Sequence, residues 1–426
     1  MNLRVLHETS MVGQGYFDPL ARAGVHRTIV GVMGELAEMP GITQGYGAFA
    51  TAESALGLEL ALSDEPTLLP GIRVPTWRWR RGTRRCAQWV LQQWIRSLKQ
   101  QPRWHPGRVT LAATYRALSA SVRKPESLPG WDVVHSWYHP LPLVGNLPNA
   151  ARILTVHDVI PLIHPEWFPE GSARYARKIL DSLTPADWVV CSSHATLTEL
   201  LRLRDHPVTR TMVIHLAADA RFTPAARDDT AQVRRHHGLG DRPYLVALGT
   251  REPRKNLARL VSAYSAAFRN RRDAPLLAIV GSQGWDKELG DALDQARDVV
   301  DGIRLLGRVA DEELPGLLAG ALALAYPSLH EGFGIPPLEA MACGTPVITS
   351  NCSSLPEVVG HAALLVDPRD TTQIATALRR MSDEPGLRAD LAARALVQAG
   401  RFSWRATATS YHALYARIAA KSLSMT

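Results

Sequence analysis

The stretch LALAYPSLHEGFGIPPLEAMACGTPVITS (322–350) decides the fold, because two apolar runs, LALAYPS and TPVITS, enclose a short loop and a helical pattern. The apolar runs are continuous rather than alternating, which is typical of strands that a parallel sheet buries on both faces. Between them, Pro336 and Pro337 suit the first turn of a helix, where a missing N–H group costs little. The stretch therefore predicts a strand, a helix over Leu338–Ala342 and a second parallel strand.

Similar apolar runs occur on both sides of this stretch. In the first half they are Leu3–Leu6, WDVVHSW (131–137), ARILTVHD (151–158) and DWVVCSS (187–193). In the second half they are PYLVALGT (243–250), PLLAIVGS (275–282), IRLLG (303–307) and ALLVD (363–367). Helical patterns lie between them at His26–Met39, Ser172–Leu183, Thr196–Leu203, Leu257–Phe268, Leu289–Val299 and Glu312–Ala319. This alternation predicts an α/β chain with parallel, doubly wound sheets.

The strand series starts again after the segment VIHLAADARFTP, which divides the chain into two Rossmann-like domains. We expect the first domain over residues 1–218 and the second over 219–403. The amphipathic tail, 404–426, is separate from the second strand set, and we expect it to pack back on the first domain. In open parallel sheets, ligands bind outside the carboxyl ends of the strands. Two such sheets facing each other therefore predict a functional cleft between the domains.

Composition narrows the classes of protein. The chain has 426 residues, 46% of them hydrophobic, so it can bury more than one core and is not a disordered protein. It contains no run of 18 apolar residues, and its start, MNLRVLHETS, does not resemble a secretory signal. The four cysteines (Cys86, Cys191, Cys343 and Cys352) are far apart, which argues against a disulfide framework or a zinc site. These features predict a soluble cytoplasmic protein of more than one domain.

The positive charge is concentrated in one segment. Between Pro66 and Pro125 there are 13 Lys and Arg residues and no Asp or Glu, so a net charge of +8 leaves 8 − 13 = −5 for the rest. Five of the 11 tryptophans lie there too. Residues 73–108 could form a solvated surface, or they could bind an anionic membrane, since Trp favours the interface and Lys/Arg the headgroups. Nucleic-acid binding is disfavoured, because the predicted scaffold carries no nucleic-acid motif.

Two carboxylates lie between the predicted strands LALAYPS and TPVITS. Glu331 comes directly after a strand, and Gly332 and Gly334 would let a ligand approach the backbone closely. The N-terminus of the following helix offers free N–H groups and a positive dipole end, which suit a phosphate. Glu339 would repel that phosphate, so its carboxylate is better placed to accept hydrogen bonds from sugar hydroxyls. The eight-residue spacing of the two glutamates is a weak motif by itself.

The whole string from Glu331 to Pro346 is more specific. It resembles the E-x7-E region of retaining glycosyltransferases with the GT-B fold, the large family 4. GTREPRKN (249–256) and LLGRVADEELPGLLAGA (305–321) also resemble segments of this family, and ILTVHDVIPLIHPEWFP (153–169) resembles its HD-x-x-P segment. The resemblance covers nearly the whole chain; it is strongest over 243–367 and weaker over 45–125.

The resemblance implies roles for particular residues. Glu331 would contact the donor sugar and Glu339 the nucleotide ribose. Lys255 and Arg254 would neutralise the diphosphate that leaves, since cations stabilise the charge that develops there. His157 would lie near both the donor sugar and the acceptor. The remaining donor-binding positions that the resemblance implies are Gly249, Gly332, Phe333, Gly334 and Val309.

Two positions depart from the family pattern or are ambiguous. Many members have an arginine directly after the glycine of the GTREPRKN segment, but here Thr250 stands there and Arg251 follows. Either Arg251 or Arg254 could therefore contact the diphosphate. The glycine-bearing loop near the N-terminus could be formed around Gly13-Gln14-Gly15 or around Gly24-Val25-His26-Arg27. We favour the second segment, with Gly24 and Arg27 on the acceptor side.

The favoured function is transfer of a hexose, with mannose preferred, from a GDP- or UDP-sugar to a glycan or lipid-linked saccharide, with retention at the anomeric carbon. The Lys/Arg pair could replace a metal ion, so we expect no metal requirement and no cofactor. The alternatives are a nucleotide-sugar epimerase of similar architecture and a non-catalytic glycan-binding scaffold. A dinucleotide-dependent oxidoreductase is disfavoured, because no complete GxGxxG follows the first strand.

Overall fold

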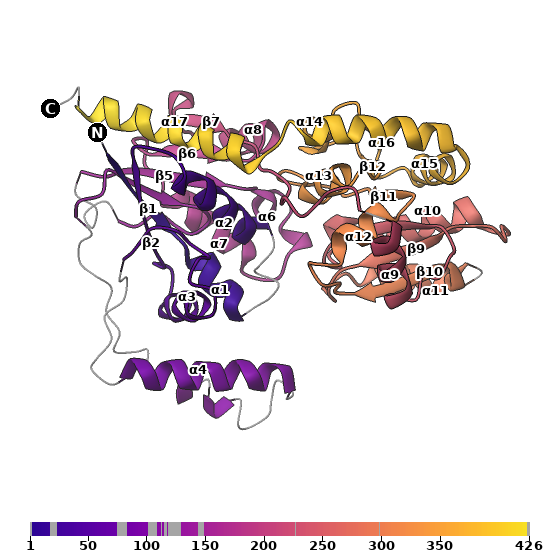
Figure 1. Cartoon of the computed structure of the whole chain (residues 1–426), viewed down its shortest axis with the longest axis horizontal. Coiled ribbons are helices and arrows are strands. Elements are labelled where there is room, and N and C mark those ends of the chain that lie inside the picture. Colours follow the sequence, from indigo (N-terminus) through magenta and orange to yellow (C-terminus); the bar gives the residue numbers. More distant parts are fainter. Residues whose placement is uncertain are drawn as a thin grey trace.

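The protein consists of two α/β bodies that lie side by side along the long axis of the molecule (Figure 1). This computed structural model describes residues 2–17, 24–74, 83–100, 109–111, 113–114, 117, 129–143, 149–225, 227–297 and 299–423.

The first body contains a seven-stranded parallel sheet in the order β3-β2-β1-β4-β5-β6-β7. Its strands are β1 (Leu3–Glu8), β2 (Ile42–Gly47), β3 (Ile72–Arg73), β4 (Val133–Ser136), β5 (Ala151–Val156), β6 (Trp188–Cys191) and β7 (Thr211–Val213). The helices of this part are α1 (Ser10–Phe17), α2 (Gly24–Ala37), α3 (Ala52–Asp64), α4 (Thr83–Gln100), α6 (Ile160–Ile163), α7 (Ser172–Asp181) and α8 (His194–Leu203). The order in which successive strands are added reverses between β1 and β4, which places a ligand site at their carboxyl ends.

The second body repeats this arrangement with six parallel strands in the order β10-β9-β8-β11-β12-β13. Its strands are β8 (Tyr244–Leu248), β9 (Leu276–Val280), β10 (Ile303–Gly307), β11 (Ala323–Tyr326), β12 (Val347–Ser350) and β13 (Ala363–Val366). Its helices are α9 (Arg227–His236), α10 (Leu257–Phe268), α11 (Glu288–Gln295), α12 (Leu314–Ala319), α13 (Ile335–Ala342), α14 (Leu355–Val359), α15 (Thr371–Asp383) and α16 (Pro385–Ala399). Each apolar run that the sequence assigns to a strand is a strand, and the predicted α/β fold with two Rossmann-like domains is confirmed.

The continuous apolar runs are explained by burial on both faces. In β8, Leu245 and Ala247 belong to the core under one face of the sheet. Tyr244, Val246 and Leu248 belong to the core under the opposite face. A strand covered on both sides cannot alternate apolar and polar residues, because all the polar side chains would then be buried without partners on one of its faces.

The last helix, α17 (Trp404–Leu423), leaves the second body and packs on the first, along the top of the molecule in Figure 1. Tyr411 and Tyr415 are completely buried in the same core as Val5 and Val133 of β1 and β4. The tail was expected to return to the first domain, and the packing confirms it. The last strand of the first sheet ends at Val213 and α9 begins at Arg227; the domain boundary at residue 219 stays a prediction.

One local prediction was wrong. A glycine-bearing loop was expected through Gly13, Gly15 and Gly24, but Gly13 and Gly15 lie in helix α1, which packs against α3, and Gly24 begins helix α2. A Cβ atom on Gly13 would lie 1.8 Å from the carbonyl oxygen of Ser54, and one on Gly57 would lie 2.1 Å from the carbonyl oxygen of Gly13. The glycines therefore allow two helix backbones to touch, and Gly13-Gln14-Gly15 is not a ligand-binding loop.

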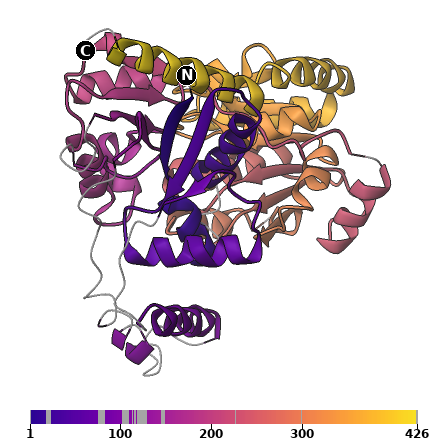
Figure 2. The ribbon, with the colours of Figure 1, turned by 60° about the vertical axis from the view of Figure 1, so that its left-hand side comes forward.

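The basic, Trp-rich segment is only partly described. Helix α4 lies beyond α3 at the edge of the first body (Figures 1 and 2). Ala87, Val90 and Leu91 are buried together with Leu56 of α3, whereas Trp89 on α4 is 58% exposed. Other positions of the predicted membrane surface lie outside the described residues, namely Trp77, Arg78, Trp79, Arg80, Arg81 and Trp104. Among the described helices, none combines the length and apolar character needed to cross a membrane.

Candidate active site

A cavity of about 400 Å³ lies between the two bodies. The first body contributes residues that follow β5 and β6, together with the start of α2. The second body contributes residues that follow β8, β9, β10 and β11 and the start of α13. The cavity is therefore at the carboxyl ends of both sheets, where the strand order predicts a ligand site.

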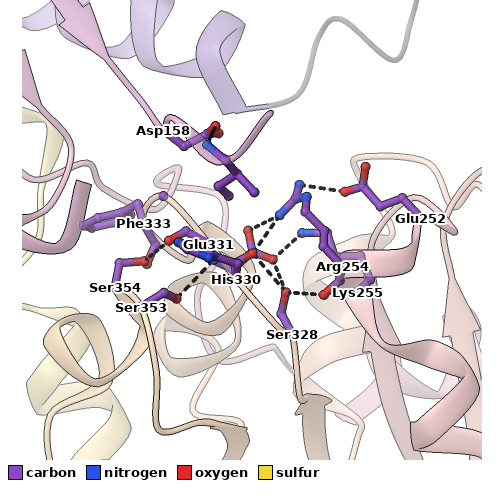
Figure 3. Close-up of polar contacts among 12 residues, drawn as sticks. Asp158, Glu252, Arg254, Lys255, Ser328, His330, Glu331, Phe333, Ser353 and Ser354 are labelled. Carbon is purple, nitrogen blue, oxygen red and sulfur yellow. Dashed lines mark hydrogen bonds and ion pairs between the residues drawn. The ribbon is translucent and has the colours of Figure 1, made fainter. Parts of the chain in front are cut away.

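Glu331 lies at the centre of a buried polar cluster on the second body (Figure 3). Its Oε2 accepts a hydrogen bond from Arg254 Nη1 at 2.6 Å, and its Oε1 accepts one from Lys255 Nζ at 2.6 Å. The hydroxyls of Tyr326 and Ser328 both donate to Oε1 at 2.7 Å. A cation therefore contacts each of the two carboxylate oxygens of Glu331.

This cluster keeps its charges although it is buried. Burial would raise the pKa of Glu331, but the charges of Arg254 and Lys255 hold that pKa well below its usual range. Burial and the neighbouring Arg254 lower the pKa of Lys255, and Glu331 opposes that shift. Burial and the charge of Glu331 raise the pKa of Tyr326 well above its usual value, so this phenol stays a hydrogen-bond donor. The site is thus a preformed set of fixed charges.

The sequence GTREPRKN positions the two cations by a tight turn. Pro253, Arg254 and Lys255 form one turn of 3₁₀ helix, and Asn256 follows in the left-handed region with φ of 60°. The side-chain amide of Asn256 donates to the carbonyl oxygens of Pro327 at 2.9 Å and Pro368 at 2.7 Å. These bonds hold the turn against the end of β11, and Arg254 and Lys255 consequently reach Glu331.

A second carboxylate connects the two bodies. Glu339 on α13 is almost completely buried and forms an ion pair with Arg27 on α2. Burial raises the pKa of Glu339 to about 7, although the charge of Arg27 acts in the opposite direction. Near neutral pH this carboxyl group therefore exists in both protonation states, unlike Glu331.

The loop at Gly332 touches the first body directly. The hydroxyl of Ser193 donates to the carbonyl oxygen of Gly332 at 2.7 Å, and that of Ser192 donates to the carbonyl oxygen of His157 at 2.7 Å. A Cβ atom on Gly332 would lie 2.1 Å from the carbonyl oxygen of His157 and 2.7 Å from Cβ of Asp158. Glycine at this position therefore allows the two bodies to meet at the site.

His157 lies where the two bodies meet. It is half-buried and lines the cavity, and loss of water around the ring lowers its pKa to about 4, so the imidazole is neutral at pH 7. Its Nε2 is buried and has no hydrogen-bond partner among the described residues. A ligand hydroxyl that enters the cavity could satisfy this atom.

The structure brings most of the predicted site residues together. The predicted residues that line the cavity are Gly24, Arg27, His157, Gly249, Arg254, Lys255, Val309, Glu331, Gly332, Phe333, Gly334 and Glu339. Arg251 does not line it, so the geometry places Arg254, and not Arg251, at the cavity. The chemical roles of these residues stay predictions.

Sequence reasoning missed several lining residues. They include Asp158, Ser192, Arg308, Asp311 and Tyr326. Most of them stand at or directly after the end of a strand, and that position was the signal that could have found them. Arg308 is exposed and follows β10; among the described residues no ion-pair or hydrogen-bond partner is found for its side chain.

Two clusters of His and Glu side chains have an arrangement that could hold a metal ion. They are His194, His215 and Glu357, and His236, His237 and Glu313. None of these six residues lines the cavity. That the site works without a metal stays a prediction.

Two facing Rossmann-like domains, with a cavity between the carboxyl ends of their sheets, define the GT-B class of glycosyltransferases. Residues 229–397 match the family described as glycosyl transferases group 1. O-antigen chain mannosyltransferase B of Escherichia coli is 36% identical over 261 residues, which are 61% of this chain and 68% of that protein. The chain belongs to this family of GT-B glycosyltransferases.

Further relatives agree with that assignment. D-inositol 3-phosphate glycosyltransferase of Salinispora arenicola is 35% identical over 312 residues, 67% of this chain and 68% of that protein. The crystal structure of HepE from Anabaena, in complex with UDP and glucose, has a TM-score of 0.62 over 97% of this chain and 100% of that chain. At 16% identity, this likeness concerns the fold. The predicted family, fold and glycosyltransferase activity are thus confirmed.

Proposed function

We propose that the protein is a retaining hexosyltransferase of polysaccharide biosynthesis that transfers mannose from a nucleotide sugar to a glycan or lipid-linked saccharide. The observation that carries the proposal is the buried cluster of Arg254, Lys255 and Glu331 at the cavity between the domains. Fixed cations in a water-poor site stabilise the charge that develops on a leaving diphosphate. The mannosyltransferase relative in Escherichia coli supports mannose as the sugar.

The proposed reaction occurs on one face of the donor sugar. The bond between the anomeric carbon and the diphosphate oxygen breaks, and the acceptor hydroxyl forms the new bond from the same side. The hydroxyl proton passes to the departing phosphate oxygen. Arg254, Lys255 and the exposed Arg308 would hold the diphosphate, and Glu331 would keep the first two in place.

We also propose that this reaction needs no metal ion. Arg254 and Lys255 supply positive charge where other transferases use a metal, and the N-terminus of α13 at Gly334 and Ile335 adds backbone N–H groups to the cavity wall. Transfer measured after exhaustive chelation should equal transfer with added Mg²⁺ or Mn²⁺. A strict dependence on added metal would overturn this part of the proposal.

The donor and the class of reaction can be tested without knowing the acceptor. The full-length protein is incubated with labelled GDP-, UDP-, ADP- and TDP-hexoses, and hydrolysis is followed by the release of free sugar. A transferase hydrolyses its donor slowly, an epimerase returns an isomeric nucleotide sugar, and a binding scaffold leaves the donor unchanged. We expect GDP-mannose to be hydrolysed and to raise the melting temperature, since ligand at 100 times its dissociation constant stabilises a protein by about 2.7 kcal/mol.

We propose a peripheral position on the cytoplasmic face of the membrane through residues 73–108. On α4, Arg85 and Trp89 are exposed while the opposite side of the helix is buried against α3. Basic residues near an anionic surface contribute about 1 kcal/mol each. This arrangement presents a cation and an aromatic ring to the surroundings, which suits an interface.

Vesicle co-sedimentation tests the membrane proposal. Vesicles with anionic lipid should bind the protein, and salt should release it because the attraction is screened. Reversal to glutamate of Arg78, Arg80, Arg81, Arg84 and Arg85 should abolish binding and leave hydrolysis of the donor unchanged. Equal binding of wild type and variant would show that the segment is only a solvated surface.

A further inference from the structure

A second cavity, of about 450 Å³, opens into the first body beside the one described above. The two cavities share three lining residues, Val25, His157 and Asp158. The second cavity lies between the ends of β4 and β5 on one side and helix α7 on the other. A molecule bound there would therefore meet the donor at His157 and Asp158.

The wall of this cavity is apolar and aromatic. Tyr138, Tyr175 and Phe168 provide aromatic rings, and the rings of Tyr138 and Tyr175 are 6.2 Å apart at 37°. Tyr138 is 36% exposed, so one ring edge or face is available to a ligand. Pyranose rings have C–H faces that bury apolar area against such rings, while their hydroxyls need a few polar partners.

The polar partners in the wall are few and uncharged or acidic. The hydroxyl of Tyr175 is hydrogen-bonded to His139 Nδ1, which fixes the orientation of the phenol. Partial loss of water in the cavity raises the pKa of Tyr138 and also that of Asp158. Asp158 already accepts a hydrogen bond from the backbone N–H of Ile160 at 3.1 Å, and its carboxylate can accept another from a hydroxyl.

The charge of this wall differs from that of the first cavity. Among the described residues, the second cavity is lined by no Lys or Arg, whereas the first is lined by Arg27, Arg254, Lys255 and Arg308. Helix α7 carries three cations, Arg174, Arg177 and Lys178, but these are exposed, and it turns Tyr175, Ala176 and Ile179 into the cavity instead. An anionic group here would lose its water without gaining a counter-ion, which is costly.

We propose that the second cavity binds the terminal sugar of the acceptor and that it selects a neutral sugar over a phosphorylated one. The inference rests on the proposed transferase function and adds a substrate class to it. The acceptor hydroxyl would reach the donor at the junction of the two cavities, next to His157 and Asp158. The phosphate of a lipid-linked acceptor would have to stay outside, towards solvent.

Selection of a neutral acceptor would distinguish this protein from one group of its relatives. The name of the Salinispora relative states an acceptor, inositol 3-phosphate, that carries a negative charge. The neutral wall of the second cavity favours instead a glycan end, as the name of the O-antigen mannosyltransferase suggests for that relative. The difference is a property of the chain's own residues and can be measured by binding.

The test uses full-length protein and saturation-transfer NMR with methyl mannopyranoside and its 6-phosphate as ligands. We expect the neutral glycoside to bind at least ten times more tightly than the phosphate. Tyr138→Ala should weaken the neutral glycoside at least tenfold, because it removes the accessible ring. Leu143→Ala is the matched control, since Leu143 is 75% exposed nearby and does not line the cavity.

A second variant, which should gain affinity for the phosphorylated sugar, makes the test independent of any stability that Tyr138→Ala loses. Ala176→Arg places a cation in the wall and should lower the ratio of neutral to phosphorylated binding. Equal or tighter binding of the phosphate by the wild type, or unchanged binding in Tyr138→Ala, would overturn the proposal. If the neutral glycoside binds as expected but no nucleotide sugar is hydrolysed, the transferase proposal fails and the sugar site remains; if hydrolysis occurs without glycoside binding, the sugar site fails.

Discussion

The two domains have the same strand order and opposite chemistry at their strand ends. In the second domain, the residues beside β8 and β11 form a charged cluster in which Arg254 and Lys255 bond to Glu331. In the first domain, three imidazoles form a neutral cluster: His7 of β1 and His135 of β4 are completely buried, and His157, which follows β5, is half-buried. Both clusters are largely buried, so burial does not by itself determine whether a strand end is charged.

In the neutral cluster, His135 is paired with hydroxyls rather than with ions, whereas both ring nitrogens of His7 and Nε2 of His157 have no hydrogen-bond partner among the described residues. His135 is hydrogen-bonded to the hydroxyls of Tyr415 and Thr155, both at 2.7 Å, and Thr155 contacts Tyr411 at 3.0 Å. Burial lowers the pKa of His135 well below its usual value and that of His7 to about 3. The comparison teaches that the fold determines where a ligand binds, and that the residue types at the strand ends determine the charge it can carry.

The largest effect is expected when the charged cluster loses its carboxylate. Glu331→Ala removes the ion-pair partner of the buried Lys255 and one of the two partners of Arg254, which keeps Glu252; this should lower the free energy of unfolding by about 3–5 kcal/mol and abolish transfer. Urea denaturation and donor hydrolysis measure the two effects. Glu312→Ala, an exposed carboxylate of the same domain, is the control. An unchanged denaturation midpoint in Glu331→Ala would show that the charged cluster does not depend on its carboxylate, and would contradict the contrast drawn with the neutral cluster.

Removal of one cation should affect function more than stability. Lys255→Ala should cost about 2–4 kcal/mol of transition-state stabilisation, or about 30- to 1,000-fold in kcat/KM. It should also weaken the binding of free nucleoside diphosphates, which calorimetry can measure. Lys287→Ala is the control, because Lys287 is exposed and does not line the cavity. Unaltered affinity for every nucleoside diphosphate would exclude Lys255 from the donor site.

The neutral cluster predicts how acid destabilises the first domain. The pKa of His7 is about 6.5 in an unfolded chain and about 3 in the fold because of burial. Between these values the unfolded chain binds a proton that the folded protein does not. The free energy of unfolding therefore falls as pH is lowered from 6.5, by about 1.4 kcal/mol per pH unit for each such histidine.

His7→Leu removes this proton binding and should reduce the slope by about that amount between pH 6 and pH 4. Urea denaturation at a series of pH values measures it. His361→Leu replaces an exposed histidine and should leave the slope unchanged. A wild-type free energy of unfolding that does not depend on pH in this range would show that His7 is not held neutral.

The smallest effect concerns Glu339, which lies in the second domain but forms an ion pair with Arg27 of the first domain. Its pKa of about 7, raised by burial, means that the carboxylate is mostly ionised at pH 8 and mostly protonated at pH 6. If the ionised form accepts hydrogen bonds from the donor ribose, KM for the donor should rise up to about tenfold as pH falls across this range.

Glu339→Gln should lose this dependence, and Glu312→Gln should keep it. The raised pKa also means that the folded protein holds this proton more tightly than the unfolded chain does. Its contribution to stability is present below about pH 4.5 and is lost as pH rises through 7. A donor KM that is constant from pH 6 to pH 8 in the wild type would contradict the proposed role.

The fold could be predicted because its signal is local. Continuous apolar runs such as PYLVALGT and PLLAIVGS are strands because both faces of the sheet are covered. The helix at Ser10–Phe17 could not be predicted in this way. Glycine at position 13 suits this helix only because the backbone of α3 at Gly57 packs directly against it, and the residues around Gly13 in the sequence do not reveal that contact.

The residues of the candidate site could be predicted from strand ends and from family resemblance. The hydrogen bonds and ion pairs among these residues could not. Distance along the chain could not decide which of Arg251 and Arg254 lines the cavity; the 3₁₀ turn places Arg254 there, and contact of either arginine with the diphosphate stays a prediction. Its position at a strand end would by itself suggest that replacement of Glu331 spares the fold. The two cations that depend on it come from 77 and 76 residues earlier in the chain, so the structure predicts a loss of stability instead.

The return of α17 to the first domain has a consequence for synthesis of the chain on the ribosome. The first domain lacks the buried side chains of Tyr411, Tyr415 and Ile418 until the ribosome has made them, and by then the whole second sheet has emerged. The domain that is translated first can therefore complete its core only after its neighbour has been translated. A nascent chain stopped before Trp404 would expose the unfilled surface over β1 and α2, which makes it a target for chaperones and proteases.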